Sequence, residues 1–259
     1  MDEELLKKII QKKEFSRLPE KDVELAFEKF DRKSELSDYQ KFKLTRNFLR
    51  KIYSSFSSGK LLGEIKKKDV EWFLNKHKST KERLPFYREV YKRIFSGITG
   101  EKISVIDLGA GINGLSYNFF PRNLKINYVG VEAVGQLVDL MNRFFLDNKI
   151  NGKAIHESLF ELEKIKKTIE EQKKLKIIFL FKVVDSLEIA ERNYSKKLLK
   201  EIVPLADKVV VSFATKSLGK RSRFSARRSW LINFVSENFK MINDFEFGGE
   251  RYLVIEKEK

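Results

Sequence analysis

The chain has 259 residues, of which 42% are hydrophobic, and it carries a formal net charge of +16. This length allows one large domain or one domain with an appendage, and the absence of cysteine excludes disulfides and thiolate-bound metals. No apolar run reaches the roughly 20 residues of a membrane span, and the charged N-terminus is unlike a signal peptide. We therefore expect a cytoplasmic protein without metal or membrane contact.

The first 96 residues show helical periodicity throughout. Hydrophobic residues recur at helical spacing, with Leu5 and Ile9 as the first such pair and Val23 and Phe27 as the next. Ser79 and Glu82 have the spacing of a capping box at the start of the last of these helices. The expected helices span residues 3–15, 22–33, 37–56, 67–77 and 79–95. This pattern predicts an all-helical N-terminal region over residues 1–96.

From residue 97 onward, short β-branched runs alternate with helical patterns. Alternation of this kind indicates a parallel sheet with crossover helices. Gly248 and Gly249 separate the last two runs, which predicts a terminal hairpin. The expected strands span residues 103–108, 126–132, 153–158, 176–182, 208–214, 240–247 and 251–257. We therefore predict an α/β fold over residues 97–259: a Rossmann-like, seven-stranded sheet, mostly parallel with one antiparallel strand.

The positive charge gathers in two stretches of the chain. Residues 41–68 hold nine basic residues against the single acid Glu64, and residues 216–228 hold six and no acid. A nucleic acid is the commonest partner for such surfaces, although 35% charged residues without cysteine is also typical of a thermophile's surface. We expect RNA contacts from Arg46, Arg50 and Lys51 in the first stretch and from Lys216, Lys220, Arg221, Arg223, Arg227 and Arg228 in the second.

A glycine-rich turn follows the first predicted strand. Gly109, Gly111 and Gly114 form G-x-G-x-x-G, and Glu132 ends the second strand, where an acid can accept hydrogen bonds from ribose hydroxyls. These features fit a dinucleotide and S-adenosylmethionine (SAM) equally. Asp107 precedes the turn, and its carboxylate would repel a pyrophosphate but stabilise an ammonium or sulfonium. The pattern therefore favours SAM, the alternative being a turn that serves close packing alone.

Four further stretches of the sequence stand out: "HKSTKERLPFYREVYKRIF", "VIDLGAGING", "LFKVVDSLE" and "VVVSFATKSLGKRSRF". Together they resemble the aminoglycoside-resistance 16S rRNA methyltransferases, which methylate N7 of a guanine. The resemblance covers most of the chain and implies a class I methyltransferase that uses SAM. It implies that Arg83 reaches the SAM carboxylate and that the glycine turn with Asn113 holds the cofactor. It also places His77, Ser79 and Thr80 along the pocket, and Lys182, Lys216 and Ser217 near the target base.

The sequence departs from the family pattern at two points. Gly114 stands for a proline, and "FKVVDS" stands where the family has L-K-x-L-P, beside the expected target base. Guanine N7 needs no general base, since its lone pair is free, so the enzyme need only position it. Asp185 would then stabilise the cationic product. Lys182, an unusual residue at the end of an apolar strand, would contribute to catalysis or form a salt bridge with Asp185 or Asp107.

We thus expect a monomer acting on the small ribosomal subunit or its 16S rRNA, with Lys182, Asp185 and Lys216 as the candidate catalytic residues. Methylation at another RNA nitrogen, or at a ribose 2′-hydroxyl with Lys182 at its centre, remains open. So do a protein or small-molecule methyltransferase and a non-catalytic RNA-binding protein with the same fold.

Overall fold

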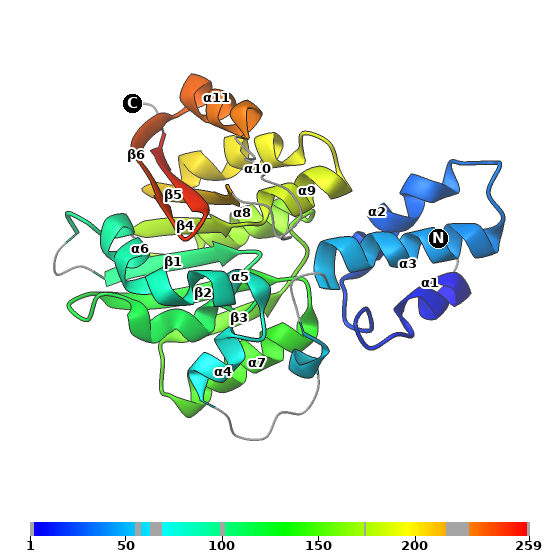
Figure 1. The fold of residues 1–259 in the computed structure, drawn as a ribbon. Helices are drawn as coiled ribbons and strands as arrows, with labels where there is room; N and C mark the ends of the chain where they lie inside the picture. The colour runs from blue at the N-terminus through cyan, green and yellow to red at the C-terminus, as the bar shows by residue number, and fades with distance from the viewer. Residues whose placement is uncertain are drawn as a thin grey trace.

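The computed structural model describes residues 3–54, 58–62, 69–98, 102–173, 175–215 and 228–257. Its centre is a seven-stranded sheet of order β3-β2-β1-β4-β5-β7-β6 (Figure 1). The strands are β1 (Lys102–Leu108), β2 (Lys125–Glu132), β3 (Gly152–His156), β4 (Lys176–Phe181), β5 (Lys208–Ala214), β6 (Lys240–Phe247) and β7 (Glu250–Glu256). The predicted α/β class and all seven predicted strands are confirmed.

The chain order reverses between β1 and β4, which lie side by side at the centre of the sheet. Strands β1 to β5 pair in parallel, whereas β7 is antiparallel to both of its neighbours, β5 and β6. The one antiparallel strand is therefore β7. In open α/β sheets a ligand binds outside the carboxyl ends of the strands at such a reversal, so the topology places a site beyond the ends of β1, β2 and β4.

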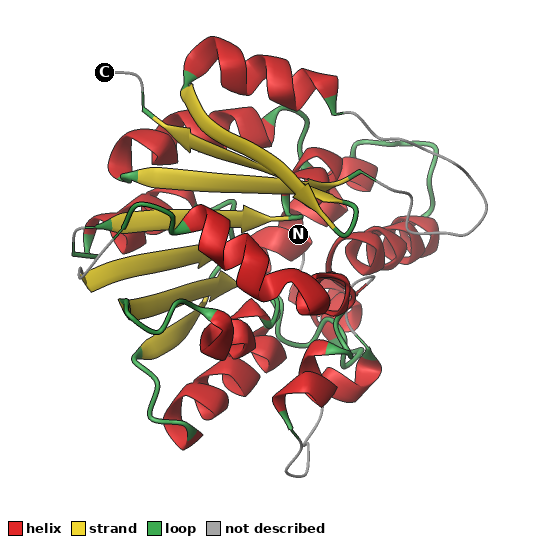
Figure 2. Cartoon of the chain, turned by 60° about the vertical axis from the view of Figure 1, so that its left-hand side comes forward, coloured by secondary structure: helices red, strands yellow, loops and turns green. Residues whose placement is uncertain are grey.

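Helices cover both faces of the sheet (Figure 2). On one face Val105 and Phe179 pack in a core cluster with Tyr91, and on the other Ile106 and Ile178 pack in a second cluster. This alternation follows from the two-residue period of a strand. The helices beside β1 to β7 are α7 (Gly135–Asp147), α8 (Leu162–Glu170), α9 (Val184–Ala190), α10 (Tyr194–Ile202) and α11 (Ser229–Asn238), with the 3₁₀ helices η4 (Asn113–Phe119) and η5 (Val203–Leu205).

The N-terminal helices divide into two groups. Helices α1 (Glu3–Ile10), α2 (Glu20–Asp31) and α3 (Asp38–Leu49) project to one side, whereas α4 (Val70–Leu74), α5 (Lys78–Arg83) and α6 (Tyr87–Ile94) lie against the sheet (Figure 1). On α6, the Tyr91 ring stacks on Phe179 of β4, with centroids 6.1 Å apart. The boundary at residue 96 stays a prediction, but α4 to α6 pack as part of the sheet's own layer.

Specific contacts hold the projecting helices against the rest of the molecule. The carbonyl of Arg17 accepts a hydrogen bond from the Gly135 amide at 3.0 Å, and the Arg17 guanidinium pairs with Asp139 on α7. Nζ of Lys29 on α2 donates to the carbonyl of Ile189 on α9 at 2.9 Å. The start and the end of α2 are thus anchored to opposite sides of the sheet's carboxyl edge.

Several predicted helices are shorter or broken. The helix expected over residues 79–95 divides at Pro85 into α5, a single turn η3 (Leu84–Phe86) and α6, because proline offers no backbone N–H to continue the helix. The helix after Gly111 is the 3₁₀ turn η4. The first helix ends at Ile10, and α3 passes into a π-helical turn, η1 (Arg50–Ser54), before the short turn η2 (Gly59–Leu61).

Candidate functional site

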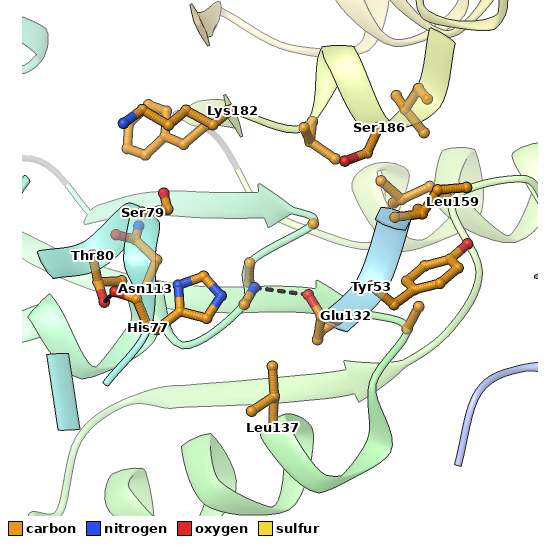
Figure 3. Close-up of a pocket in the computed structure, with 18 of the residues that line it drawn as sticks. Tyr53, His77, Ser79, Thr80, Asn113, Glu132, Leu137, Leu159, Lys182 and Ser186 are labelled. Atoms are coloured by element: carbon orange, nitrogen blue, oxygen red, sulfur yellow. Dashed lines mark hydrogen bonds between the residues drawn. The ribbon is translucent and has the colours of Figure 1, made fainter. Parts of the chain in front are cut away.

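A cavity opens at the carboxyl edge of β1, β2 and β4, as the topology requires. Residues of α5 lie at one end of it, Tyr53 and Leu159 lie at the other, and Glu132 lies between them (Figure 3). Its lining includes His77, Ser79, Thr80, Arg83, Gly109, Gly111, Asn113, Glu132 and Lys182, all of them predicted site residues. The structure therefore brings together most of the cofactor residues inferred from the sequence.

The glycine turn needs glycine for reasons of space as well as conformation. Gly109 and Gly111 have φ angles of +74° and +55°. A Cβ atom at Gly109 would lie 2.6 Å from Cγ2 of Val183, and one at Gly111 would lie 2.8 Å from the His77 ring. At Gly114 a Cβ atom would meet Phe145 of α7 at 2.6 Å, so this third glycine permits close packing. The first two glycines shape the cavity, and the third serves the core.

Glu132 holds a fixed position at the end of β2. Its carboxylate accepts hydrogen bonds from the amides of Gly111 at 2.7 Å and Val134 at 2.8 Å. Burial raises the pKa of Glu132, although these two amides oppose the shift. An ionised carboxylate offers about four acceptor sites, so Glu132 keeps lone pairs for hydroxyl groups in the cavity.

Asp107 lies beneath the turn and is absent from the cavity lining. Its Oδ2 accepts hydrogen bonds from Asn113 Nδ2 at 2.7 Å and from the Tyr128 hydroxyl at 2.6 Å. Burial raises the pKa of Asp107, while both donors lower it. We expected Asp107 to face the charges of a ligand directly. In this arrangement it acts on the cavity through Asn113, which does line it.

Arg83 is the centre of a polar network and is itself buried, with only 2% of its surface exposed. Its guanidinium donates to Glu250 at 2.7 Å, to Asn113 at 3.0 Å and to the hydroxyls of Ser79 at 3.1 Å and Tyr252 at 3.2 Å. A guanidinium has five N–H donors, so these four hydrogen bonds leave one donor for an anionic group. The network sets the orientation of Arg83 toward the cavity.

Lys182 forms different ion pairs from those we expected. Its Nζ lies 2.7 Å from Glu82 and 3.2 Å from Glu250, and the expected pairing with Asp185 or Asp107 is wrong. The residue adopts a left-handed backbone, with φ +58°, and its amide bonds to the carbonyl of Ser212 at 3.1 Å. This backbone turns Lys182 out of the strand direction and toward α5, where Glu82 meets it.

The capping box predicted for Ser79 and Glu82 is also wrong. Helix α5 begins after His77, which makes no side-chain cap hydrogen bond. Ser79 accepts from Arg83 instead, Glu82 pairs with Lys182, and the Thr80 hydroxyl donates to the Leu74 carbonyl at 2.6 Å. These polar side chains therefore build the cavity wall and the ion-pair network instead of the helix start.

The ring of His77 packs closely against Gly111 of the glycine turn. Burial, together with the nearby Arg83 charge, lowers the pKa of His77 to about 3. The ring is therefore neutral at physiological pH. A neutral imidazole beside Gly111 fixes the turn without adding a charge to the cavity.

Glu250 is the functional residue that the sequence reasoning missed. It begins β7, is buried, and accepts hydrogen bonds from both Arg83 and Ser212. Burial alone would raise the pKa of Glu250, but the charges of Arg83 and Lys182 hold this pKa below its usual value. The sequence did offer one signal, because Glu250 is the acid that directly follows the predicted hairpin turn. The antiparallel pairing of β7 with β5 brings Glu250 opposite Ala214.

The projecting helices also reach the cavity, which the sequence reasoning did not foresee. Asp22 of α2 and Ile52 and Tyr53 of η1 line it, together with Leu159 and Phe160 after β3. No sequence motif marks these residues. The available signal was Asp22 itself, an acid directly before the apolar Val23 on the predicted amphipathic helix.

The second basic stretch is described at its flanks. β5 ends at Ala214, next to the Ser212 carbonyl that binds the Lys182 amide, and Arg228 forms a two-fold hydrogen-bonded pair with Asp185, both contacts at 2.8 Å. Both flanks thus lie beside residues 182–186 at the cavity. The predicted residues Lys216, Ser217, Lys220, Arg221, Arg223 and Arg227 lie outside the described residues.

Two predicted RNA-binding residues of the first basic stretch, Arg46 and Arg50, have partners within the protein. The Arg46 guanidinium donates to the carbonyls of Lys8 and Ile9, the last turn of α1. Arg50 pairs with Glu14 at 2.9 Å, and with Lys51 it lines a groove beside Tyr53. Arg46 therefore serves to hold α1 on α3, whereas Arg50 and Lys51 line the groove beside Tyr53, and their contact with RNA stays a prediction.

The part of the chain that the structure describes contains neither a metal-binding cluster nor a membrane-spanning helix. Its His, Asp and Glu side chains form no cluster of three or more that could hold a metal ion. In the same residues, no helix is long and apolar enough to cross a membrane.

Comparison with known proteins agrees with this geometry. The 16S rRNA (guanine(1405)-N(7))-methyltransferase of Proteus mirabilis is 23% identical over 197 residues, which are 71% of this chain and 64% of that protein. Its counterpart from Micromonospora rosea is 25% identical over 70% of this chain and 63% of its own length. The chain thus matches slightly less than two thirds of these relatives.

Solved structures share the fold. The 16S rRNA methyltransferase RmtF in complex with S-adenosyl-L-homocysteine superposes with a TM-score of 0.80, at 20% identity over the whole of both chains. The 16S rRNA methylase RmtB gives 0.77 at 20% identity over 98% of each chain. The family model "Ribosomal RNA methyltransferase (FmrO)" matches residues 41–233, which is more than half of the sequence. The chain therefore belongs to the FmrO family of ribosomal RNA methyltransferases.

Proposed function

We propose that the protein is a SAM-dependent methyltransferase that methylates N7 of a guanine in 16S rRNA. The observation that carries the proposal is the cavity between α5 and η1, with a guanidinium at one end and the Glu132 carboxylate at its middle (Figure 3). Family membership and the names of the relatives support the substrate. The guanine named for those relatives is the first candidate target.

The residues present fit SAM. Arg83 has one N–H donor left for a carboxylate, and Glu132 has acceptor capacity for two ribose hydroxyls. Gly109 and Gly111 leave space that a Cβ atom would fill. Among the described residues that line the cavity, the charged basic side chains are Arg83 and Lys182, and both are paired with Glu250. The charge balance therefore fits SAM better than a dinucleotide.

SAM supplies an electrophilic methyl group on a sulfonium, which is attacked in line with the bond that breaks. Guanine N7 brings its own lone pair, so the protein needs to orient the base rather than deprotonate it. The cavity's cations are already balanced: Arg83 and Lys182 face Glu250 and Glu82, and Arg228 faces Asp185. Of the described residues, these three cations are therefore compensated and do not oppose the cationic 7-methylguanine that forms.

Two features argue against a reaction that begins with deprotonation. His77, whose pKa is about 3, is buried against the turn. Lys182 Nζ is held in ion pairs with Glu82 at 2.7 Å and Glu250 at 3.2 Å, so it is not placed as a free group beside the cavity. Methylation of a ribose 2′-hydroxyl by a Lys182-centred site is therefore the weaker alternative.

We further infer that the protein acts as a monomer in the cytoplasm, where ribosomal RNA is found. Arg50, Lys51 and the stretch around Lys216 to Arg228 would contact the phosphates of the RNA. The thermophilic origin considered from the composition stays a prediction.

A transfer assay tests this function. Purified protein and labelled SAM are incubated with small ribosomal subunits, free 16S rRNA, a cell-extract protein fraction and a metabolite fraction. We expect label in 16S rRNA, in subunits or in the free RNA. Label in protein or metabolites with none in RNA would overturn the substrate, and no label together with no calorimetric binding of SAM would overturn the enzyme.

A further inference from the structure

One carboxylate in the cavity has no assigned role. Asp22 lies on α2, outside the sheet layer, yet it lines the cavity and only 3% of its surface is exposed. Burying a charged group is costly unless it has partners. Burial, the largest influence, raises the pKa of Asp22 to about 6, although the hydroxyls of Ser158 and Tyr53 oppose the shift. Such a group calls for an explanation.

The two oxygens of Asp22 are in different situations. Oδ1 accepts a hydrogen bond from the Tyr53 hydroxyl, which fixes the carboxylate. Oδ2 is buried and accepts no hydrogen bond of good geometry from the described residues, although the Ser158 hydroxyl is close enough to the carboxylate to influence its pKa. Because a buried acceptor without a donor costs about 1–3 kcal/mol, a ligand with a donor group at this point would gain that energy on binding.

The position of Asp22 in the cavity defines which part of the ligand it meets. Arg83 and Ser79 lie at the α5 end, Glu132 lies in the middle, and Tyr53, the partner of Asp22, lies at the far end with Leu159 (Figure 3). A molecule whose carboxylate meets Arg83 and whose ribose meets Glu132 extends its base toward Tyr53. The walls there are apolar, with Ile52, Leu159 and Phe160, as suits the faces of a flat ring.

Asp22 is held in place from both sides of α2. Before the helix, the Arg17 carbonyl accepts a hydrogen bond from Gly135 at the start of α7, and near its end Lys29 donates to Ile189. These contacts join α2 to elements that follow β2 and β4. The carboxylate therefore has a defined distance from the turn and from Glu132, as a group that selects a ligand must have.

From these observations we propose that Asp22 accepts a hydrogen bond from the exocyclic amino group of the cofactor's adenine. The projecting helices thereby complete the cofactor site and select the base. This inference rests on the proposed function, in which the cavity holds SAM. A purine with a carbonyl oxygen at the same position would place an acceptor against Oδ2 and would bind more weakly.

The test compares two ligands that differ at this one group. Calorimetry measures the affinity for S-adenosylhomocysteine and for S-inosylhomocysteine, in which an oxygen replaces the amino group. We expect the unmodified protein to prefer the adenine ligand at least tenfold, as for a hydrogen bond to a charged group. Asp22→Asn, whose amide can donate to the oxygen, should reduce the preference to within about twofold or reverse it.

Three controls keep the test specific. Asp22→Ser gives a second variant should the asparagine variant fold poorly, and it too should lose the preference. Asp147→Asn, an exposed acid at the end of α7, and Glu163→Gln, an exposed acid on α8, both lie outside the cavity lining and should both keep it. Binding of S-adenosylhomocysteine without a preference, or a preference that survives both changes at Asp22, would overturn this inference alone. Failure of the unmodified protein to bind either ligand would overturn the proposed function with it.

Discussion

Arg83 and Glu250 form a buried ion pair, with Nη2 and Oε1 2.7 Å apart, that joins α5 to β7 at the edge of the cavity. Lys182 lies 3.2 Å from the other carboxylate oxygen, so one acid balances two cations. Removing one partner of a buried pair leaves a charge without compensation. The orientation of Arg83, and with it the α5 end of the cavity, depends on this acid.

Glu250→Ala should therefore lower the free energy of unfolding by about 3–5 kcal/mol and weaken the binding of S-adenosylhomocysteine. Urea denaturation and calorimetry measure the two effects. Glu246→Gln is the matched control, since Glu246 is an exposed acid on β6 of the same hairpin, and it should change neither quantity. An alanine variant as stable as the unmodified protein would show that Arg83 and Lys182 do not need this acid.

Gly111→Ala should abolish cofactor binding through its effect on His77. Gly111 and Gly97 both have a positive φ, but a Cβ atom at Gly111 would meet the His77 ring at 2.8 Å, whereas one at Gly97 would meet nothing within 4 Å. Gly97→Ala thus measures the backbone strain alone, about 1–2 kcal/mol. We expect calorimetric affinity to fall more than tenfold for the Gly111 variant and to stay unchanged for the Gly97 variant. Equal effects would place the cause in backbone strain.

His77 should make the protein acid-sensitive. Its pKa is about 3 in the folded state against 6.5 unfolded, so between these values the unfolded chain binds the additional proton. Stability is complete above pH 6.5 and is lost as the pH falls toward 3. Between pH 7.5 and 5 the unmodified protein should lose about 2 kcal/mol relative to His77→Gln. A difference between the two proteins that does not vary with pH would contradict a buried neutral His77.

Asp22 has the opposite effect on stability without ligand. Its folded pKa of about 6 lies above the unfolded value of 3.8, so the folded chain holds the proton more tightly. The carboxyl therefore destabilises the fold above pH 6, and this cost fades as the pH falls toward 4. Asp22→Asn should raise the free energy of unfolding at pH 7.5 by up to about 3 kcal/mol, with little gain at pH 4. Loss of stability at pH 7.5 would mean that the carboxylate is paired in the free protein.

RNA docking should depend on Arg50 and Lys51. Phosphate contacts carry affinity and salt dependence, so replacing both residues with Ala should lower the slope of log affinity against log salt by up to about 0.9 for each lost contact. Arg46 is left intact because it holds α1 in place. Replacing Lys102 and Lys125, at the opposite edge of the sheet, is the control. An unchanged slope in the first variant would make these residues ordinary surface charges.

The sequence predicted the parts of the site that local patterns encode. The glycine turn follows β1 directly and Glu132 ends β2, so spacing along the chain was enough to find them. The partners of Lys182 could not be found in this way. They lie on α5 and β7, far away in sequence, and a tertiary contact rather than a motif selects them. The same holds for Asp22 and Tyr53, which depend on how α2 docks.

Helix boundaries failed for a local reason. Pro85 interrupts an amphipathic pattern that continues across it, so periodicity indicated one helix where the structure has two. The mistaken capping box has a different cause, which lies in tertiary contacts. Ser79 and Glu82 have the right spacing, but both side chains gain more from Arg83 and Lys182 than from the helix start.

Mapping the methylated atom tests the central claim most directly. Small subunits and free 16S rRNA are treated with the protein and SAM, the RNA is cleaved at 7-methylguanine by borohydride and aniline, and primer extension locates the break. We predict one new break at a guanine of 16S rRNA, dependent on SAM and absent with Gly111→Ala. Methyl incorporation into the RNA without any such break would contradict guanine N7 as the target.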